Sequence, residues 1–401
     1  MQRLFLLNGK VQFYGWGGFH FIPSLLNIPN PEERPFAEYW LGAHPALSAT
    51  IGYAGKETTL HDYIQANPRG TLGALTAEKF ASLPFLLKVL DVRQMLSIQV
   101  HPDLVQGREG FERENAQGIP VDAPHRNYKD ANHKPELMVA LGDFWLLHGF
   151  KPEAELRETL ETVTELRPLL PAFETGGYKG LYESVMVSGS TDIEVLLAGL
   201  QRRVLPAYDA GTLQRSSPDF WAARAFRTFN AKAPDRGIFS IYFFNLLHVR
   251  KGEGLFQDAG LPHAYLEGQN IEIMANSDNV LRAGLTDKHV DVAELMKLVK
   301  FEATKPAIIP ATADDLVTYK SPAAEFELSR LALSEGTVRE QSGEEATVLL
   351  VMAGSVNIHT TEGSMRLERG QAAFCAAGDP LSIAADADAV VFSASVPVRK
   401  N

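Results

Sequence analysis

The sequence contains a single cysteine, Cys375, among its 401 residues. One thiol cannot form an intrachain disulfide, and it cannot supply the several thiolates of a cysteine-rich zinc site. This excludes a small secreted protein held together by disulfides and fits a reducing compartment. We expect Cys375 itself to pack as a small buried hydrophobe.

The chain also lacks long apolar runs and an excess of positive charge. No apolar segment approaches the roughly 20 residues of a transmembrane helix, and the apolar stretch after Met1 is too short for a secretory signal. There are 38 Lys and Arg against 49 Asp and Glu, a formal net charge of −11. Nucleic acids and anionic membranes require a concentrated basic surface. We therefore expect a cytoplasmic protein that binds neither nucleic acid nor membranes. We also expect it to be a monomer.

What the chain does have is the composition of an ordinary globular protein, 45% hydrophobic and 22% charged, at a length typical of two or three domains. Short apolar runs between Gly and Pro turns predict strands in residues 1–55, 85–101 and 137–141. Residues 59–83 have a more helical pattern. Residues 151–235 have helical spacing with an acidic exposed face, and Asp192 and Ser217 are the expected N-caps.

Strand character returns at Ile238–Phe244 and continues to Val249, through 270–274, and in short segments from 347 to 392. These patterns predict a mainly β protein with a helical insertion. Residues 1–150 and 236–310 would form one discontinuous domain, 151–235 the insertion, and 311–401 a C-terminal β domain. Short strands at steady spacing in that last domain are typical of a sandwich or jelly roll.

The stretch Leu96-Ser97-Ile98-Gln99-Val100-His101 alternates strictly between apolar and polar residues. Side chains on a strand repeat every two residues, so Ser97, Gln99 and His101 would share one face. Such a face is most often simply exposed to solvent. A Gln and a His at strand spacing can also be two metal ligands that point into a cavity.

Polar residues that interrupt strongly apolar strands are candidates for a site inside a barrel. Two imidazoles, a carboxylate and an amide oxygen would suit a divalent cation of intermediate softness. The spacing alone is not specific for metal, and buried structural residues remain an alternative at this point. The candidates are Gln99, His101, Glu136 and His263.

Several cations accompany these candidates. Lys88 lies inside an apolar run, where it either snorkels from a strand end or supplies charge to a pocket. Lys134 is two residues from Glu136 and shares its face if the chain is extended. Arg282 and Lys288 flank a Gly and could receive an anion, since Arg matches phosphate oxygens bidentately. Read alone, the last two are equally compatible with exposed loop residues.

The segment Gly260-Leu261-Pro262-His263-Ala264-Tyr265 looks like a loose form of the second motif of the cupins. Taken with six further stretches, the chain closely resembles the type I mannose-6-phosphate isomerases. These stretches run in order from the N-terminus to about residue 305: Tyr14-x-Trp16-Gly17, Ala37-Glu38-x-Trp40-x-Gly42-x-His44-Pro45, Leu83-Pro84-Phe85-Leu86-x-Lys88-Val89-Leu90, Leu96-Ser97-Ile98-Gln99-Val100-His101-Pro102, Asp130-x-Asn132-His133-Lys134-Pro135-Glu136, and Ser277-Asp278-Asn279-Val280-x-Arg282-Ala283-Gly284.

The resemblance implies a catalytic cupin barrel. The C-terminal strands have the strand and Gly rhythm of a second cupin barrel but only His359 as a possible ligand, so we expect that barrel to be a metal-free structural copy. The resemblance also implies one zinc ion per chain on Gln99, His101, Glu136 and His263, and a sugar phosphate as substrate. The implied reaction interconverts mannose 6-phosphate and fructose 6-phosphate through a cis-enediol. The pocket residues of the family fall on Ser97, Lys134, Tyr265, Glu272, Asp278, Arg282 and Lys288.

Roles within that pocket follow from chemistry. Aldose–ketose isomerisation needs a base that reaches both C1 and C2, an electrophile and a phosphate anchor. Glu272 is the first candidate for the base and Asp278 its rival, while Lys134 could donate to the enediolate or the ring oxygen. Arg282 would hold the phosphate, with Lys288, Lys88 and Ser97 as weaker candidates.

Two other functions are compatible with a cupin. In an oxygenase, His101, His263 and Glu136 would hold iron. Gln99 argues against this function, because it would occupy a position on the metal that oxygen needs. Arg282 and Lys288 argue against it too, because an oxygenase does not need to bind a phosphate. A sugar-binding cupin without turnover would show affinity and no isomerase activity.

Overall fold

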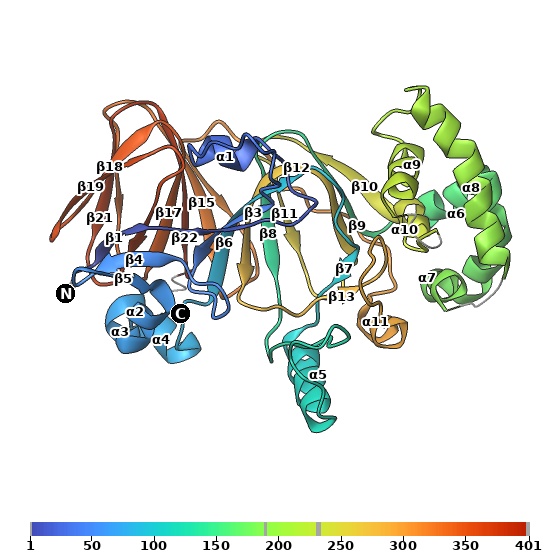
Figure 1. Cartoon of the computed structure of the whole chain (residues 1–401), viewed down its shortest axis with the longest axis horizontal. Helices are drawn as coiled ribbons and strands as arrows, with labels where there is room; N and C mark the ends of the chain where they lie inside the picture. The colour runs from blue at the N-terminus through green and yellow to red at the C-terminus, as the bar shows by residue number, and fades with distance from the viewer. Residues whose placement is uncertain (1, 188–190, 230–233, 398–401) are drawn as a thin grey trace.

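The computed structural model describes residues 2–187, 191–229 and 234–397. Three parts lie in a row along the long axis of the molecule (Figure 1): a β-sandwich of C-terminal strands, a central barrel, and a group of helices. The mainly β architecture with a helical insertion is as the sequence predicts.

The central barrel is a ten-stranded sheet ordered β10-β9-β12-β6-β3-β2, from which β7, β8, β11 and β13 branch. Its centre is the long strand β12, which pairs with β6, β7, β8 and β9. The strands are β2 (Lys10–Gln12), β3 (Glu38–Gly42), β6 (Phe85–Val92), β7 (Gln99–Val100), β8 (Glu136–Ala140), β9 (Phe144–Phe150), β10 (Phe244–Val249), β11 (Gly254–Gln257), β12 (His263–Ala275) and β13 (Leu281–Arg282).

The two faces of this sheet bury different kinds of side chain. On β12, Ile271 and Ile273 point outward into a core shared with the C-terminal sandwich, whereas Glu272 between them points inward. The same alternation sets Leu87 and Val89 outward and Lys88 inward on β6. Each fully buried aliphatic side chain contributes about 1.5–3 kcal/mol, and this packing fixes the register that keeps the charged residues inside the barrel.

The C-terminal sandwich packs a six-stranded sheet, β1-β20-β17-β22-β15-β14, against a four-stranded one, β16-β21-β18-β19. Cys375 is buried between them, as expected, while His359 is exposed. The strands are β1 (Leu4–Leu7), β14 (Leu316–Tyr319), β15 (Glu327–Leu333), β16 (Val338–Gln341), β17 (Thr347–Ala353), β18 (Ser355–Thr360), β19 (Gly363–Glu368), β20 (Ala372–Cys375), β21 (Leu381–Ala385) and β22 (Ala389–Ser395).

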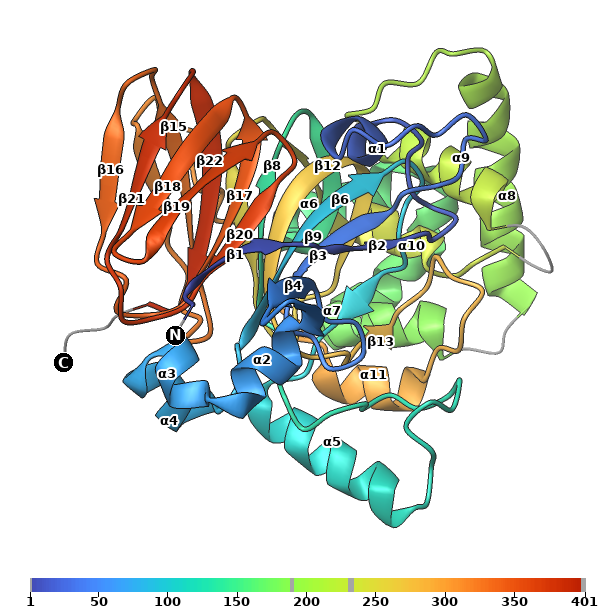
Figure 2. The ribbon, with the colours of Figure 1, turned by 60° about the vertical axis from the view of Figure 1, so that its left-hand side comes forward.

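The first strand of the chain, β1, is part of the sheet formed by the C-terminal strands. β1 pairs antiparallel with β20, with Leu4 opposite Cys375 and Leu7 opposite Ala372, and Figure 2 shows the two strands side by side. A separate two-stranded sheet, β4 (Thr50–Tyr53) with β5 (Lys56–Thr59), follows β3.

Helices cover the barrel and extend from it. The helical pattern predicted for residues 59–83 corresponds to three short helices between Leu60 and Phe80, and the Thr59 hydroxyl caps the first of them by accepting from the Asp62 amide. The bounds are α1 (Phe21–Leu25), α2 (Leu60–Ala66), α3 (Pro68–Leu72), α4 (Ala74–Phe80), α5 (Leu104–Ala116), α6 (Glu153–Thr162), the 3₁₀ helix η1 (Thr164–Leu169), α7 (Leu170–Met186), α8 (Thr191–Asp209), α9 (Pro218–Thr228), α10 (Ile238–Phe243) and α11 (Val292–Leu298).

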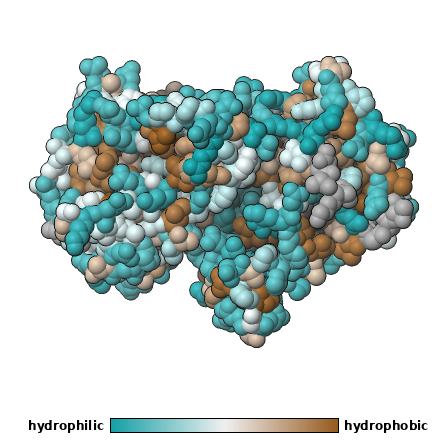
Figure 3. Space-filling model, viewed as in Figure 1, coloured by the Kyte–Doolittle hydropathy of each residue, from teal (hydrophilic) through white to brown (hydrophobic). Residues whose placement is uncertain are grey.

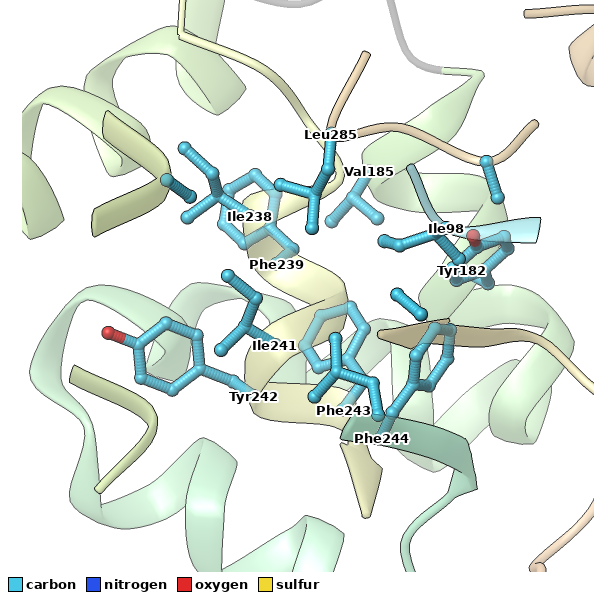
Figure 4. Close-up of a cluster of buried hydrophobic side chains, with 14 of the residues drawn as sticks. Ile98, Tyr182, Val185, Ile238, Phe239, Ile241, Tyr242, Phe243, Phe244 and Leu285 are labelled. Atoms are coloured by element: carbon cyan, nitrogen blue, oxygen red, sulfur yellow. The ribbon is translucent and has the colours of Figure 1, made fainter. Parts of the chain in front are cut away.

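One predicted strand is a helix. Residues 238–243 form α10, and only the continuation from Phe244 is a strand, β10. Figure 4 shows why the pattern misleads: Ile238, Phe239 and Phe243 lie within one apolar cluster that surrounds the helix. A segment buried on all sides has no polar face, so its periodicity does not distinguish helix from strand.

The two expected N-caps differ in outcome. Ser217 caps α9 by accepting a hydrogen bond from the Asp219 amide, as predicted. Asp192 lies inside α8, which begins one residue earlier, so its assignment as the N-cap is wrong. Its carboxylate still lies in the first turn, where negative charge favours the positive end of the helix dipole.

Among the described residues, no helix combines the length and the apolar character that crossing a membrane requires. On the face drawn in Figure 3, hydrophobic residues form separate brown patches among hydrophilic ones. The exposed large hydrophobics are correspondingly scattered over the chain, for example Leu75, Val105 and Val338.

Candidate metal centre and substrate pocket

Three predicted ligands meet at the inner face of the barrel. Donor atoms of His101, Glu136 and His263 all lie within 4.8 Å of one another, and all three side chains are buried. Glu136 bridges the imidazoles: its Oε1 is 3.4 Å from His101 Nε2 and its Oε2 is 3.5 Å from His263 Nε2. Residues 35 and 127 positions apart in the sequence thus form one cluster.

Backbone contacts orient both imidazoles toward that cluster. His101 Nδ1 donates to the Asn279 carbonyl and His263 Nδ1 to the Leu261 carbonyl, each at 2.9 Å. With the proton on Nδ1, the Nε2 lone pairs face Glu136. The buried His101 Nε2 has no hydrogen-bond partner. A buried imidazole nitrogen without a partner, beside a carboxylate and a second imidazole, fits a divalent cation.

Gln99 lies beside this cluster on a shorter strand than predicted. β7 comprises only Gln99 and Val100, because the preceding residues bond irregularly to two segments: the Leu96 amide to the Tyr265 carbonyl and the Ile98 amide to the Gly284 carbonyl. The predicted strand over 96–101 is therefore mostly extended loop. Gln99 pairs with His263 on one side and with Arg282 on the other.

Neighbouring charges keep Glu136 ionised. Burial opposes the charged carboxylate, but the Lys134 ammonium, with its Nζ 2.9 Å from Glu136 Oε1, outweighs it and holds the pKa of Glu136 well below its usual range. Burial lowers the pKa of His101 to about 4. A carboxylate and a neutral imidazole are the protonation states that a metal requires.

A small pocket of about 60 Å³ adjoins the cluster. In it the Tyr265 hydroxyl donates to Glu272 Oε2 at 2.8 Å, and Lys88 Nζ lies 3.4 Å from Glu272 Oε1. Burial and then the charge of Glu136 raise the pKa of Glu272. Burial opposes the charge of Lys88, but Glu38 and Glu272 outweigh it and raise its pKa. Lys88 is buried in mid-strand, so it does not snorkel from a strand end.

The small pocket shares part of its lining with a cleft of about 490 Å³, whose other lining residues include Ser97, Asp278, Arg282 and Lys288. Arg282 is half-buried, and burial lowers its pKa. Burial and repulsion from Arg282 lower the pKa of Lys288. Cations that repel one another in this way form a site that an anion stabilises. All twelve predicted site residues lie in or beside these two adjoining spaces or in the metal-ligand cluster.

Known proteins resemble this chain over nearly its whole length. Residues 4–153 match the family model of the phosphomannose isomerase type I catalytic domain. A mannose-6-phosphate isomerase of Salmonella typhimurium (strain LT2) is 38% identical over 394 residues, covering 94% of this chain and 95% of that protein. This chain belongs to the type I phosphomannose isomerase family.

Solved structures of the family share its fold. A zinc-bound mannose 6-phosphate isomerase superposes with a TM-score of 0.89 at 33% identity, covering 99% of this chain and 100% of that one. A second, from Salmonella typhimurium and bound to fructose 6-phosphate and zinc, gives a TM-score of 0.88 at 33% identity over the same shares. The cupin fold expected of this family member is therefore confirmed.

Several residues of this phosphomannose isomerase homologue received no role from the sequence. Glu38 accepts from Trp40 Nε1 at 2.5 Å and lies 3.5 Å from Lys88 Nζ, and His44 Nε2 is 3.6 Å from Asp278 Oδ1. Glu38, Trp40 and His44 all belong to one of the motifs shared with the family, and that shared motif could have indicated that they belong to the pocket. Contacts made by a backbone carbonyl, such as that of Asn279, cannot be predicted from residue type, because every residue has such a carbonyl.

A buried histidine beside the site predicts a pH dependence of stability. Burial lowers the pKa of His148 to about 4, and its Nδ1 is 2.7 Å from Gln257 Oε1. In the unfolded chain the imidazole titrates near 6.5. Between these values the unfolded state binds more protons, so the free energy of unfolding falls as pH decreases through this window, by about 3 kcal/mol in total for this one group.

His148→Gln should therefore weaken the pH dependence of the metal-free protein. The measurement is the free energy of unfolding in urea at several values between pH 7 and pH 4.5. The drop over that range should be smaller in the variant than in the wild type by about 2–3 kcal/mol. An identical drop in both proteins would contradict the assignment.

Proposed function

We propose that this chain interconverts D-mannose 6-phosphate and D-fructose 6-phosphate through a cis-enediol, with one zinc ion per chain. The observation that carries the proposal is the buried His101–Glu136–His263 cluster beside a pocket that shares its lining with a cleft containing Arg282 and Lys288. Relatives that span nearly the whole chain are named mannose-6-phosphate isomerases, and related structures hold zinc and fructose 6-phosphate.

Gln99, His101, Glu136 and His263 would hold the zinc ion. Two imidazoles, a carboxylate and an amide oxygen form a neutral-to-anionic donor set of intermediate softness that suits zinc. When bound, the ion supplies Lewis acidity to an oxygen of the substrate. The remaining chemistry falls to the side chains of the chain itself.

Glu272 would carry the proton between C1 and C2. Its pKa is raised by burial, and a carboxylate with a raised proton affinity serves better as both base and acid near neutral pH. The Tyr265 hydroxyl and the Lys88 ammonium hold its two oxygens in place. Asp278 remains the rival for this role, but its side chain is 45% exposed at the cleft rim. Lys134 would donate to the enediolate or the ring oxygen.

Arg282 would be the main anchor of the phosphate, supported by Lys288 and Ser97 in the same cleft. Lys88 is less suited to that role, because it already lies between Glu38 and Glu272. Anchoring the phosphate away from the reacting carbons uses binding energy to orient C1 and C2.

The test is a coupled assay that follows fructose 6-phosphate formed from mannose 6-phosphate, combined with metal analysis of the purified protein. We expect about one zinc per chain, loss of turnover on chelation, and its recovery when zinc is restored. Sugar-phosphate binding without turnover would instead identify a binding protein, and oxygen consumption with bound iron an oxygenase.

Arg282→Ala should lower kcat/KM by about 10- to 100-fold, because it removes charge-assisted hydrogen bonds worth about 1.5–3 kcal/mol. Zinc content should stay at the wild-type value, since Arg282 belongs to the cleft and not to the ligand cluster. Steady-state kinetics and metal analysis on the same preparation check both points. Loss of zinc in this variant would show that Arg282 supports the ligand shell instead.

We propose the division into a catalytic domain of residues 1–150 and 236–310, an insertion of 151–235 and a C-terminal domain of 311–401, with β1 contributed to the last of these. A charged sugar phosphate does not cross membranes unaided, which supports a cytoplasmic location. The net charge of −11 disfavours a nucleic-acid partner, and a monomer is proposed.

A further inference from the structure

Two loops that lead into the site are joined by one buried side chain, Asn279. It is completely inaccessible to solvent. Its Oδ1 accepts from the backbone amides of Lys129 and Asp130, at 2.7 and 3.2 Å. Its Nδ2 donates to the carbonyls of Asp130 and Asn132, both at 2.8 Å. One amide group therefore satisfies four backbone groups of the segment that continues into Lys134 and Glu136.

The backbone of the same residue contacts a metal ligand. The Asn279 carbonyl accepts the Nδ1–H of His101 at 2.9 Å, the contact that directs His101 Nε2 toward Glu136. The next strand along the chain, β13, carries Arg282 and pairs with Gln99. The residue thus lies between the ligand His101, the loop that leads into Glu136 at the start of β8, and the segment that carries the phosphate anchor.

Asp130 closes this arrangement from the other side. Its Oδ1 accepts from the Ser277 hydroxyl at 2.8 Å, and its Oδ2 accepts from the Asp278 amide at 2.7 Å. The side-chain bonds of Asn279 and Asp130 described here all join residues 129–132 to residues 277–279. A carbonyl held from both sides in this way keeps a fixed position relative to the imidazole that it orients.

We propose that Asn279 is a positioning residue of the metal centre, which sets the orientation of His101 and its distance from Glu136 by clamping the two loops together. The inference rests on the proposed zinc function of the site. Metal affinity would then depend on Asn279 through the orientation of His101, although the Asn279 side chain is not itself a ligand.

The sharpest variant is Asn279→Asp. Aspartate has the same size but no Nδ2–H donors, so a carboxylate oxygen would face the Asp130 and Asn132 carbonyls and Asp130 Oδ1, which is 3.3 Å from the present Nδ2. Asn279→Ala removes the bonds without adding charge, and it provides the test should the Asp variant fail to fold.

Asn245→Asp is the matched control. Asn245 on β10 also uses its Nδ2 to donate to backbone carbonyls of neighbouring segments, those of His148, Phe150 and Thr304, at 2.9 to 3.0 Å. Among these partners His148 pairs in register with His263, but none of them belongs to the segments 129–132 and 277–279. Both Asp variants therefore lose the same type of bond, but only Asn279→Asp loses it between those two segments.

The measurement is calorimetric titration of zinc into each metal-free protein, with its thermal midpoint recorded in parallel. We expect the Asn279 variants to bind zinc about 10- to 100-fold more weakly than the wild type, and Asn245→Asp to be less heat-stable while binding zinc normally. Wild-type zinc affinity in a folded Asn279 variant would overturn the inference, and so would equal weakening in Asn245→Asp. If the wild-type chain binds zinc but does not isomerise mannose 6-phosphate, the proposed function is refuted. The role of Asn279 is still tested in that case, because it depends only on the zinc affinities of the variants and the wild type.

Discussion

His263→Ala is expected to abolish stoichiometric zinc binding and to lower isomerase turnover by a factor on the order of 10³ or more. The variant removes one of two imidazoles from a cluster whose donors lie within 4.8 Å of one another. It leaves Glu136 with one imidazole partner and Lys134, and a Lewis acid contributes several kcal/mol to stabilising a developing oxyanion. Activity and metal content should therefore fall together.

The check is metal analysis and turnover on one preparation, followed by assay with excess zinc. His359→Ala is the matched control, because His359 is exposed on β18 of the C-terminal sandwich and should be dispensable. Gln99→Ala should act in the same direction with a smaller effect, since an amide is a weaker ligand than an imidazole. Full zinc occupancy in His263→Ala would remove the proposed ligand shell.

Glu272→Gln is expected to lower kcat by about 10²- to 10⁴-fold while the protein keeps its zinc. The substitution preserves size and leaves an acceptor for the Tyr265 hydroxyl, but the amide cannot take a proton from carbon. Lys88 keeps a carboxylate neighbour in Glu38, 3.5 Å away, so the cation is not left unpaired. The expected loss is therefore in chemistry and not in folding.

The pH profile distinguishes a base from a merely structural carboxylate. Burial and Glu136 raise the pKa of Glu272, so wild-type kcat/KM should fall as pH decreases through that raised value, where the base becomes protonated. This acidic limb should disappear in Glu272→Gln. Asp278→Asn is the parallel variant. If Asp278→Asn loses the acidic limb and Glu272→Gln retains it, Asp278 is the base and Glu272 is not.

Much of the site was predictable because it is written in strand alternation and residue type. Glu272 between Ile271 and Ile273 can be assigned to the inner face by counting, and the structure places it there. The metal-ligand candidates are polar residues that interrupt apolar strands, and three of them meet in one cluster. The ordered motifs indicate the family, and a relative that covers 94% of the chain confirms it.

Other features were decided only by the tertiary structure. Residues 238–243 have the composition of a buried strand, yet they form α10, because a segment surrounded by apolar side chains has no polar face to reveal its period. The pairing of β1 with β20 joins residues more than 360 positions apart, and nothing local encodes that partner.

By itself, the sequence determined which side chains can do chemistry and which face of each strand they occupy, since both follow from residue identity and a two-residue repeat. The three-dimensional fold decided how those side chains are held. The Asn279 and Leu261 carbonyls that orient the two imidazoles are backbone groups, common to all residues, so only the folded chain shows which of them reaches a ligand.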